Sequence, residues 1–591
     1  MFRTARRIAP LLQSLLLGAV TVTSVGATAA TLVGCADESE PETHVKYLDD
    51  VARRTAAVTR LVQFFEDAMT KDKKDRNGPN VKPLLDKIIE PMTKVCVGGD
   101  LDEKTQSKLV RFISDARDAR GADCLVKALK DFKPEVNEED VRWAARAVGP
   151  MNLKAASGPL LDVFVKLRPS KLKKVPELYR DVHDALVDLK DPAWEAQLIT
   201  QLNRPINDRK DMQNLRDEVY WQTTAAELLG TMKSKAAVKP LIKAVISPMK
   251  ADIAATAVSA LIKIGKDAVG PTIALLKSED KELVDYSIAE NHKGAAALDP
   301  KAAEAAKKTA DKAHIGIAAI ILGTIGREEA APPMIDALAS AEDMPRAIIA
   351  RELAKLPKSP ETVKAFQAAY EKTPNSLSIP PGMGAKEALL DASGTFYDAS
   401  FVPWIVSTAM ALKGEADDVD PIRAASLTTV MKLATSDQIA EVEKLVAAKA
   451  NGPDGKPSTL GKAYEKEWKI AKGLLAACGD KTECYLAKLA EPASQTNENQ
   501  FQGIKAAYMV AVYGNPDVRQ KLIDIMPKLT HAALRFVSVQ VIDRYSPKGD
   551  AGLAAKLQKI VDDGEASKDS NKMAGNAPFK TVIYRLTARA Q

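Results

Sequence analysis

The stretch that decides the fold is Ala251–Leu276, which reads ADIAATAVSALIKIGKDAVGPTIALL. Apolar residues in its first half share one helical stripe: Ile253, Ala257, Leu261 and Ile264. The second half repeats this spacing with Val269, Ile273 and Leu276. Apolar residues three or four positions apart are typical of an amphipathic helix. The stretch therefore predicts two helices, Ala251–Ile264 and Lys266–Leu276, joined at Gly265.

The same two-helix pattern recurs along the chain. It predicts three further pairs: Glu218–Thr231 with Lys235–Ile246, Ala313–Gly326 with Glu328–Ala339, and Pro421–Ala434 with Asp437–Ala447. A helix pair every ~30 to 45 residues is the signature of an α-solenoid. One pair cannot bury its apolar face alone, so stacked neighbours share a continuous core. The predicted fold is all-α, an α-solenoid of stacked helix pairs over residues 46–591.

These units resemble HEAT repeats, best at Asp140-Val141-Arg142 and at Ala237-Val238-Lys239-Pro240-Leu241. In that family an aspartate begins the second helix, and an arginine two or three residues later helps to tie adjacent repeats. The resemblance gives this repeat-stacking role to two residue pairs, Asp140 with Arg142 and Asp420 with Arg423. It covers roughly residues 105–560 and implies HEAT-like helix pairs with a curved protein-binding surface.

The N-terminus has the layout of a secretory signal, with three early arginines, an apolar stretch and then small residues. The stretch Leu32-Val33-Gly34-Cys35 resembles the lipobox of bacterial lipoproteins, whose cysteine becomes the lipid-bearing first residue. We therefore expect a signal peptide over residues 1–34, lipidation of Cys35 and an acidic tether over residues 35–45. An uncleaved N-terminal anchor is the alternative.

This leader predicts a cell-envelope protein that contacts a membrane through its N-terminal lipid. In the lipoprotein family, an aspartate directly after the cysteine tends to retain the protein in the inner membrane. Here that position is Ala36. The resemblance therefore favours the outer membrane over the inner membrane.

Cysteine usage supports export. If Cys35 carries lipid, four cysteines remain, and an even number in an exported protein indicates two disulfides. Proximity in the sequence favours Cys96–Cys124 and Cys478–Cys484 over crossed pairings. Metal binding is the alternative, but neither pair has a nearby histidine or CxxC spacing.

Charge and motifs exclude several functions. The formal net charge is +6, and removing the leader's three arginines leaves 81 basic residues against 78 acidic ones, or +3. Such a balance does not predict nucleic-acid binding.

The chain has no P-loop, HExxH, GxGxxG or GxSxG motif. We therefore expect no cofactor, no metal site, no catalytic residue and no small-molecule substrate. His183 is predicted to lie on a solvated helix face, and the tryptophans in repeat cores.

Two stretches interrupt the repeats, 278–300 and the Pro/Gly-rich 372–384. They are candidate hinges, and they leave open whether the chain is one solenoid or two. The predicted function is a non-catalytic scaffold or adaptor that binds a protein partner of unknown identity. One alternative is an enzyme, or an accessory subunit, with a site on one of these two insertions. The other is a structural element of the envelope that acts mainly as a spacer.

Overall fold

The computed structural model describes residues 37–98, 101–296, 311–357, 359–375, 384–412, 416–450, 459–568 and 576–590, with residues 303, 304, 307 and 573. These residues form helices, turns and short 3-10 segments, and no β-strand occurs among them. The predicted all-α solenoid is therefore confirmed. The chain divides into two compact units, Met1–Val95 and Cys96–Gln591.

The described part of the first unit consists of α1 (Pro41–Tyr47), α2 (Arg54–Lys71) and most of α3 (Val81–Gly98). The side chain of His44 is buried and lies between the rings of Tyr47 and Phe64, with centroid distances of 5.9 and 5.8 Å. An ion pair of 2.5 Å joins Lys87 of α3 to Glu42 of α1. These contacts fix α1 against the two longer helices.

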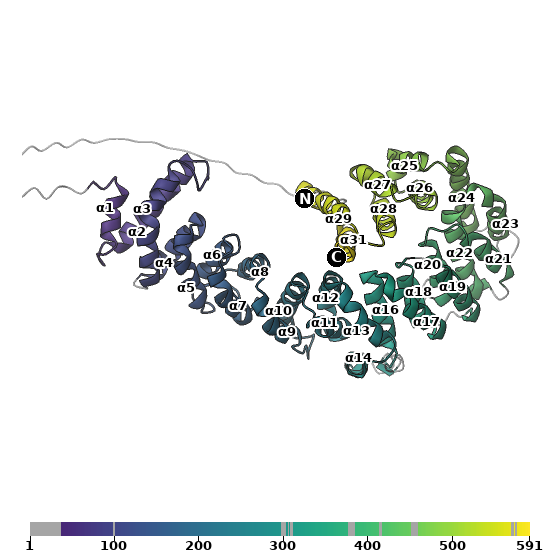
Figure 1. Ribbon diagram of the computed structural model, residues 1–591, viewed down its shortest axis with the longest axis horizontal. Coiled ribbons are helices and arrows are strands. Elements are labelled where there is room, and N and C mark those ends of the chain that lie inside the picture. The colour runs from purple at the N-terminus through teal and green to yellow at the C-terminus, as the bar shows by residue number, and fades with distance from the viewer. Residues whose placement is uncertain are drawn as a thin grey trace, which may run out of the picture. The chain divides into compact units, whose positions relative to one another are not determined.

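The second unit stacks its helices in two layers (Figure 1). We call the helices that pack on one another along the inside of the stack the inner layer: α4 (Glu103–Ala116), α6 (Glu138–Val148), α8 (Leu178–Leu189), α10 (Met212–Thr231), α12 (Ala251–Ile264), α16 (Ala313–Ile325), α18 (Asp343–Leu353), α20 (Ala385–Gly394), α22 (Ala416–Leu433), α26 (Gln500–Tyr513), α28 (Ala532–Arg544) and α31 (Asn576–Arg589).

Another helix packs behind most members of the inner layer. This outer layer is α5 (Ala122–Lys130), α7 (Ser157–Lys166), α9 (Glu195–Leu202), α11 (Val238–Ile246), α13 (Lys266–Leu276), α17 (Ala331–Ser340), α19 (Pro360–Lys372), α21 (Phe401–Ala411), α23 (Ile439–Ala450), α25 (Thr482–Ala490), α27 (Val518–Ile525) and α29 (Ala551–Ser567). Two more helices add to the stack, α14 (Lys281–Ala296) against α11 and α16, and α24 (Thr459–Cys478) against α22, α23 and α26.

The pair α12 and α13 shows why the sequence folds in this way. The predicted stripe of α12 is buried, with Ile253 and Leu261 fully so. In α13, Val269 and Leu276 are buried as predicted, whereas Ile273 is half-buried and the neighbouring Leu275 is fully buried. Gly265 separates the helices with φ of +73°, a conformation that residues with a Cβ rarely adopt. The chain turns at this residue, and α12 then packs chiefly on α10 and α11 while α13 packs chiefly on α16.

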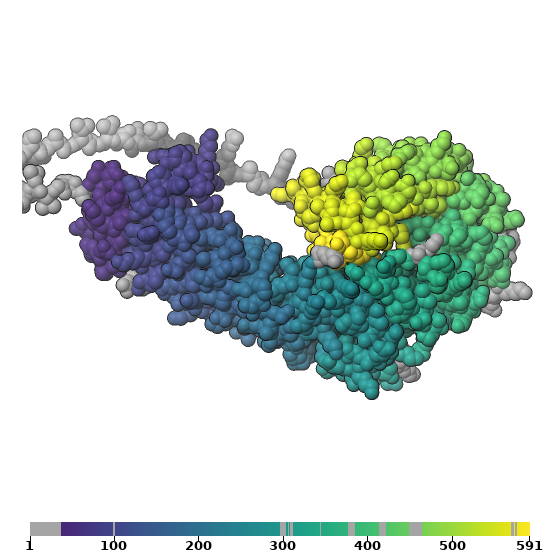
Figure 2. Space-filling view, viewed as in Figure 1, coloured from purple at the N-terminus to yellow at the C-terminus, as the bar shows by residue number. Residues whose placement is uncertain are grey.

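The inner layer of the second unit closes on itself. The C-terminal helix α31 packs not only on α28 and α29, its neighbours in the chain, but also on α12 and α16. Figure 2 shows the C-terminal residues, in yellow, seated against the teal helices of the middle of the chain. The solenoid therefore bends until its last inner helix covers part of its own inner face.

Two disulfides cross-link neighbouring helices. Cys96, at the end of α3, is bonded to Cys124 of α5, and Cys478, at the end of α24, is bonded to Cys484 of α25. These are the pairings that the sequence predicts. Cys96 and Cys124 are fully buried, so this cross-link lies within the packed core of the first repeats.

Two segments of the structure differ from their predictions. The tether expected over residues 35–45 ends earlier, because α1 begins at Pro41, whose fixed φ suits the first turn of a helix. The interruption expected over 278–300 contains the helix α14, which buries Leu283, Ser287 and Glu290 against the stack. The Pro/Gly-rich part of the other hinge, 376–383, lies outside the described residues.

No single helix of the described residues is long and apolar enough to cross a membrane. The pair Val238–Ile246 and Pro248–Ile264 meets the length and composition criteria together, but it is bent by 93°.

Candidate binding surface

Side chains tie successive inner helices together between α4 and α8. Asp140 of α6 is buried and accepts a hydrogen bond from Ser107 of α4, and burial raises the pKa of its carboxyl group. Arg142 of α6 donates from Nε to Asp181 of α8 over 3.0 Å. The HEAT-like pair Asp140 and Arg142 thus contacts the helix before it and the helix after it.

The second HEAT-like pair is only partly described. Arg423 of α22 donates to the backbone carbonyl of Leu412, which follows α21, over 2.9 Å. The side chain of Asp420 lies outside the described residues. Cys35 and the whole leader also lie outside them.

His183 links α8 to α10 rather than lying on a solvated face. Its Nε2 is 3.0 Å from Glu227 of α10, and its Nδ1 is 3.1 Å from Asp184. The hydrogen bond with Glu227 raises the pKa of His183, and the same bond lowers the pKa of Glu227. The pair therefore joins two inner helices most strongly when the imidazole is protonated.

We expect His183→Gln to destabilise the chain at acidic pH and to have little effect at alkaline pH. The folded-state pKa of His183 is raised, so its contribution is fully present below its unfolded pKa of about 6.5 and is lost as pH rises through the folded pKa. Because the pair is partly exposed, we expect a loss of at most ~1 kcal/mol. Urea unfolding at about pH 5.5 and pH 9 measures this difference; equal losses at both values would contradict it.

A buried carboxylate ties α31, the helix that makes the closure, to its chain neighbour α28. Asp543 of α28 contacts two arginines of α31, with 2.8 Å between its Oδ2 and Nη1 of Arg585, and with its Oδ1 accepting from Nη2 of Arg589. All three side chains are at most 6% exposed. Burial lowers the pKa of Arg585 to about 10, so the guanidinium remains charged at neutral pH. One carboxylate thus partly balances two cations in the core.

Guanidinium groups also cap the ends of inner helices. Arg544 of α28 donates to the carbonyls of Ala354, Leu356 and Thr395, which follow α18 and end α20. Arg585 reaches the carbonyl of Lys355 over 3.1 Å. Carbonyls at a helix C-terminus lack partners within the helix and carry partial negative charge. The side chains of α28 and α31 therefore satisfy helix ends that are distant in sequence.

Gly326, at the end of α16, makes this close approach possible. Its φ is +74°, and a Cβ at this position would overlap the guanidinium of Arg585. We expect Gly326→Ala to lose ~1–3 kcal/mol more stability than Gly479→Ala, because the added methyl group must displace Arg585. Gly479 has a similar φ of +58° and open space around it. Its substitution therefore measures the cost of backbone strain alone, without a steric clash. Urea unfolding compares the two; equal losses would contradict the contact.

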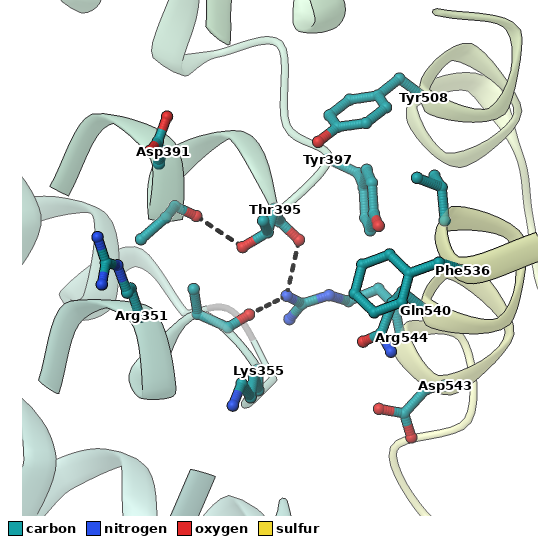
Figure 3. A pocket seen from close by; sticks show the side chains of 13 residues that line it. Arg351, Lys355, Asp391, Thr395, Tyr397, Tyr508, Phe536, Gln540, Asp543 and Arg544 are labelled. Carbon is teal, nitrogen blue, oxygen red and sulfur yellow. Dashed lines mark hydrogen bonds between the residues drawn. The ribbon is translucent and has the colours of Figure 1, made fainter. Parts of the chain in front are cut away.

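A cavity of about 260 Å³ lies where α28 faces α18 and α20 (Figure 3). The rings of Tyr397 and Tyr508 pack edge to face at 5.0 Å on one side of it, and Phe536, 49% exposed, lies beside them. Arg544 extends between the two sides and is held by the carbonyls named above. Burial raises the pKa of Tyr397 to about 12, so its hydroxyl stays protonated. We interpret this cavity as part of the closure and not as a binding site, because the guanidinium of Arg544 is already hydrogen-bonded to carbonyls at helix ends.

A second hollow lies on the inner layer between α8 and α10, which pack on each other far less than α6 does on α8 or α10 does on α12. Its volume is about 450 Å³. Tyr179 and Arg180 line it from α8, and Arg216 and Tyr220 from α10. We call this hollow the α8–α10 groove. The part of the inner layer that carries it is not covered by α31.

One pair of side chains has the spacing of a nucleophile and a base. Ser278 Oγ lies 2.8 Å from Nε2 of the buried His314, beside a cavity of about 320 Å³. Burial lowers the pKa of His314, which keeps the ring neutral. However, His314 Nδ1 has no carboxylate partner among the described residues. Within the same residues, no group of three or more His, Cys, Asp or Glu side chains is arranged to hold a metal ion.

The tryptophans occupy two kinds of position. Trp194, Trp221 and Trp468 are buried in repeat cores. Trp143 is half-buried on α6, and three arginines stack around its ring at 5.0 to 5.7 Å: Arg111, Arg142 and Arg146. Trp404 is also half-buried and packs on Tyr370 and Phe401. Core packing thus accounts for three of the five.

No protein-family model matches the chain, and no curated protein matches it. Solved structures align with it at low similarity. A chain from a study of a phosphorylation switch in the interaction between cadherin and beta-catenin is 11% identical, with 93% of this chain and 99% of that chain covered and a TM-score of 0.27. The karyopherin Kap121p bound to the extreme C-terminus of the phosphatase Cdc14p is 12% identical, with 89% and 68% covered and a TM-score of 0.32. Importin beta is 9% identical, with 92% and 84% covered and a TM-score of 0.25. TM-scores this low carry no argument about function, and the description as a helical solenoid rests on the chain's own helices.

Proposed function

We propose that this protein is an exported lipoprotein that acts as a non-catalytic scaffold and binds a protein partner on the open part of its inner layer. The binding role rests on one observation: α31 covers α12 and α16, whereas the inner helices from α4 to α10 carry an uncovered groove. Export is supported by the leader and by two cysteine pairs at bonding distance, since disulfides persist in oxidising compartments.

Crosslinking in cells tests the binding role. A photoreactive amino acid in place of Tyr179 would stand in the α8–α10 groove, and one in place of Lys166 on the outer helix α7 serves as the control. We expect a crosslinked protein partner from position 179 and none from position 166. No crosslink from position 179, or the same products from both positions, would contradict the proposal.

The anchor is tested by Cys35→Ala. Lipid attached at Cys35 would hold the wild-type protein in membranes and in a detergent phase, whereas the variant should become soluble in the aqueous phase. Ala36→Asp is the matched variant for the choice of membrane, and we expect it to move the protein from the outer to the inner membrane fraction. A Cys35→Ala protein that still partitions with membranes would refute lipidation at this residue.

The enzymatic alternative is favoured by the Ser278–His314 pair alone. A fluorophosphonate probe reacts with activated serine nucleophiles. Labelling of the wild-type protein that disappears in Ser278→Ala would replace the scaffold proposal with a hydrolase. We expect no labelling, because no carboxylate orients His314 among the described residues.

A further inference from the structure

The α8–α10 groove has aromatic walls and is bordered by a loop that hydrogen bonds fix to α10. The rings of Tyr179 and Tyr220 lie 5.8 Å apart at 84°, and Phe164 packs behind Tyr220 at 5.5 Å. Pro169, from the segment between α7 and α8, also lines the groove. The next residue, Ser170, is fixed to the buried Asp217 of α10 by two hydrogen bonds of 2.8 Å. The groove is therefore an apolar slot with its loop held in place.

The walls of this slot contain hydroxyl groups without partners. Tyr220 is only 9% exposed, and its hydroxyl has no hydrogen-bond partner among the described residues. The hydroxyl of Thr223, one helical turn further along α10, is likewise buried without a partner. Both hydroxyl oxygens are buried beneath the surface of the groove, so the wall that a ligand meets here is the apolar part of these side chains.

The charged groups that line the groove favour an anion. Arg180 and Arg216 are exposed, and neither forms an ion pair among the described residues. Arg180 contacts the hydroxyl of Tyr179 instead, over 3.2 Å. The acidic side chain in the lining, Asp184, is hydrogen-bonded to His183. Two available guanidinium groups thus stand beside an apolar slot, and guanidinium groups bind carboxylates in a bidentate manner.

We propose that the α8–α10 groove binds an acidic segment of a partner protein, with an apolar side chain of that segment packed on the aromatic wall that Tyr179 and Tyr220 form and its carboxylates at Arg180 and Arg216. This inference rests on the proposed scaffold function and specifies the chemistry of the partner. A peptide fits better than a compact ligand because the groove is open along the surface and pairs an apolar wall with two exposed guanidinium groups.

Selection from a displayed library of random dodecapeptides on the purified full chain tests this. We expect enriched peptides to combine Asp or Glu with a nearby aromatic or aliphatic residue. A fluorescent peptide of the enriched sequence should bind at least about tenfold more weakly to Arg180→Glu/Arg216→Glu. Tyr179→Ala, which removes one ring from the aromatic wall, should weaken binding by about 3- to 10-fold.

The matched control is Lys130→Glu/Lys166→Glu, which changes net charge equally on the exposed outer face of α5 and α7. We expect it to bind the peptide as the wild type does. No enriched sequence, enrichment without acidic residues, or equal weakening by the control would overturn the inference. If crosslinking in cells recovers a partner that Arg180→Glu/Arg216→Glu still binds, the groove inference fails and the scaffold function stands. If the wild type recovers none, the scaffold function itself fails.

Discussion

Asp543→Ala is expected to destabilise the C-terminal repeats by about 3–5 kcal/mol, the cost of breaking a buried ion pair by removing one partner. The variant leaves Arg585 and Arg589 buried without their shared carboxylate. In a solenoid, each helix pair is stabilised chiefly by its neighbours, so the loss should appear locally. We expect faster hydrogen exchange in α31 and in the ends of α12 and α16, and an earlier unfolding transition in urea.

The control for this prediction is Asp563→Ala. Asp563 of α29 pairs with Lys559 over 2.9 Å, but its side chain is 66% exposed. Exposed pairs within one helix contribute about 0.3–0.5 kcal/mol. A loss in Asp543→Ala no larger than that of the control would show that the buried carboxylate does not hold α31 in place.

Removal of the first disulfide is expected to cause the second large loss of stability. Cys96→Ala/Cys124→Ala releases a loop with a sequence separation of 28 residues, and on the chain-entropy model this costs about 3.6 kcal/mol. Both cysteines are fully buried. The effect should appear as unfolding of the first repeats at lower urea concentration. Reduction of the wild-type protein by dithiothreitol should reproduce it.

The second disulfide provides an internal comparison. Cys478 and Cys484 are separated by only 6 residues, so their loop is short and its removal should cost about 2.4 kcal/mol. The two double variants should therefore differ, with the larger loss near α3 and α5. No measurable loss in either would contradict a structural role for the cross-links.

Local patterns predict much of this fold. The boundaries of α12 and α13 follow from the sequence to the residue, because their apolar stripes are regular and Gly265 marks the turn. An irregular pattern, by contrast, can hide a helix. α14 carries charged and polar residues around Leu283, and its hydrophobic periodicity is weak. Packing against α11 and α16 forms this helix, and such packing is not visible in a single local pattern.

The closure and the groove depend on contacts that are distant along the chain. Arg544 bonds to the carbonyl of Leu356, which is 188 residues earlier, and Arg585 to that of Lys355. A signal for these residues does exist: Asp543, Arg585 and Arg589 are charged residues at positions where neighbouring turns are apolar. Nothing in the sequence pairs them, however. His183 and Glu227 are likewise joined only by the stacking of α8 on α10.

The most direct test of the account is a cross-link across the closure. Tyr584 of α31 faces α12 across the closure, with the Nζ of Lys263 4.9 Å from the centre of its ring. With a photoreactive amino acid in place of Tyr584 we therefore expect an intramolecular link from α31 to α12, seen as a linked peptide by mass spectrometry. Links from this position that never include α12, or that form only between two molecules, would contradict a solenoid that closes on its own inner face.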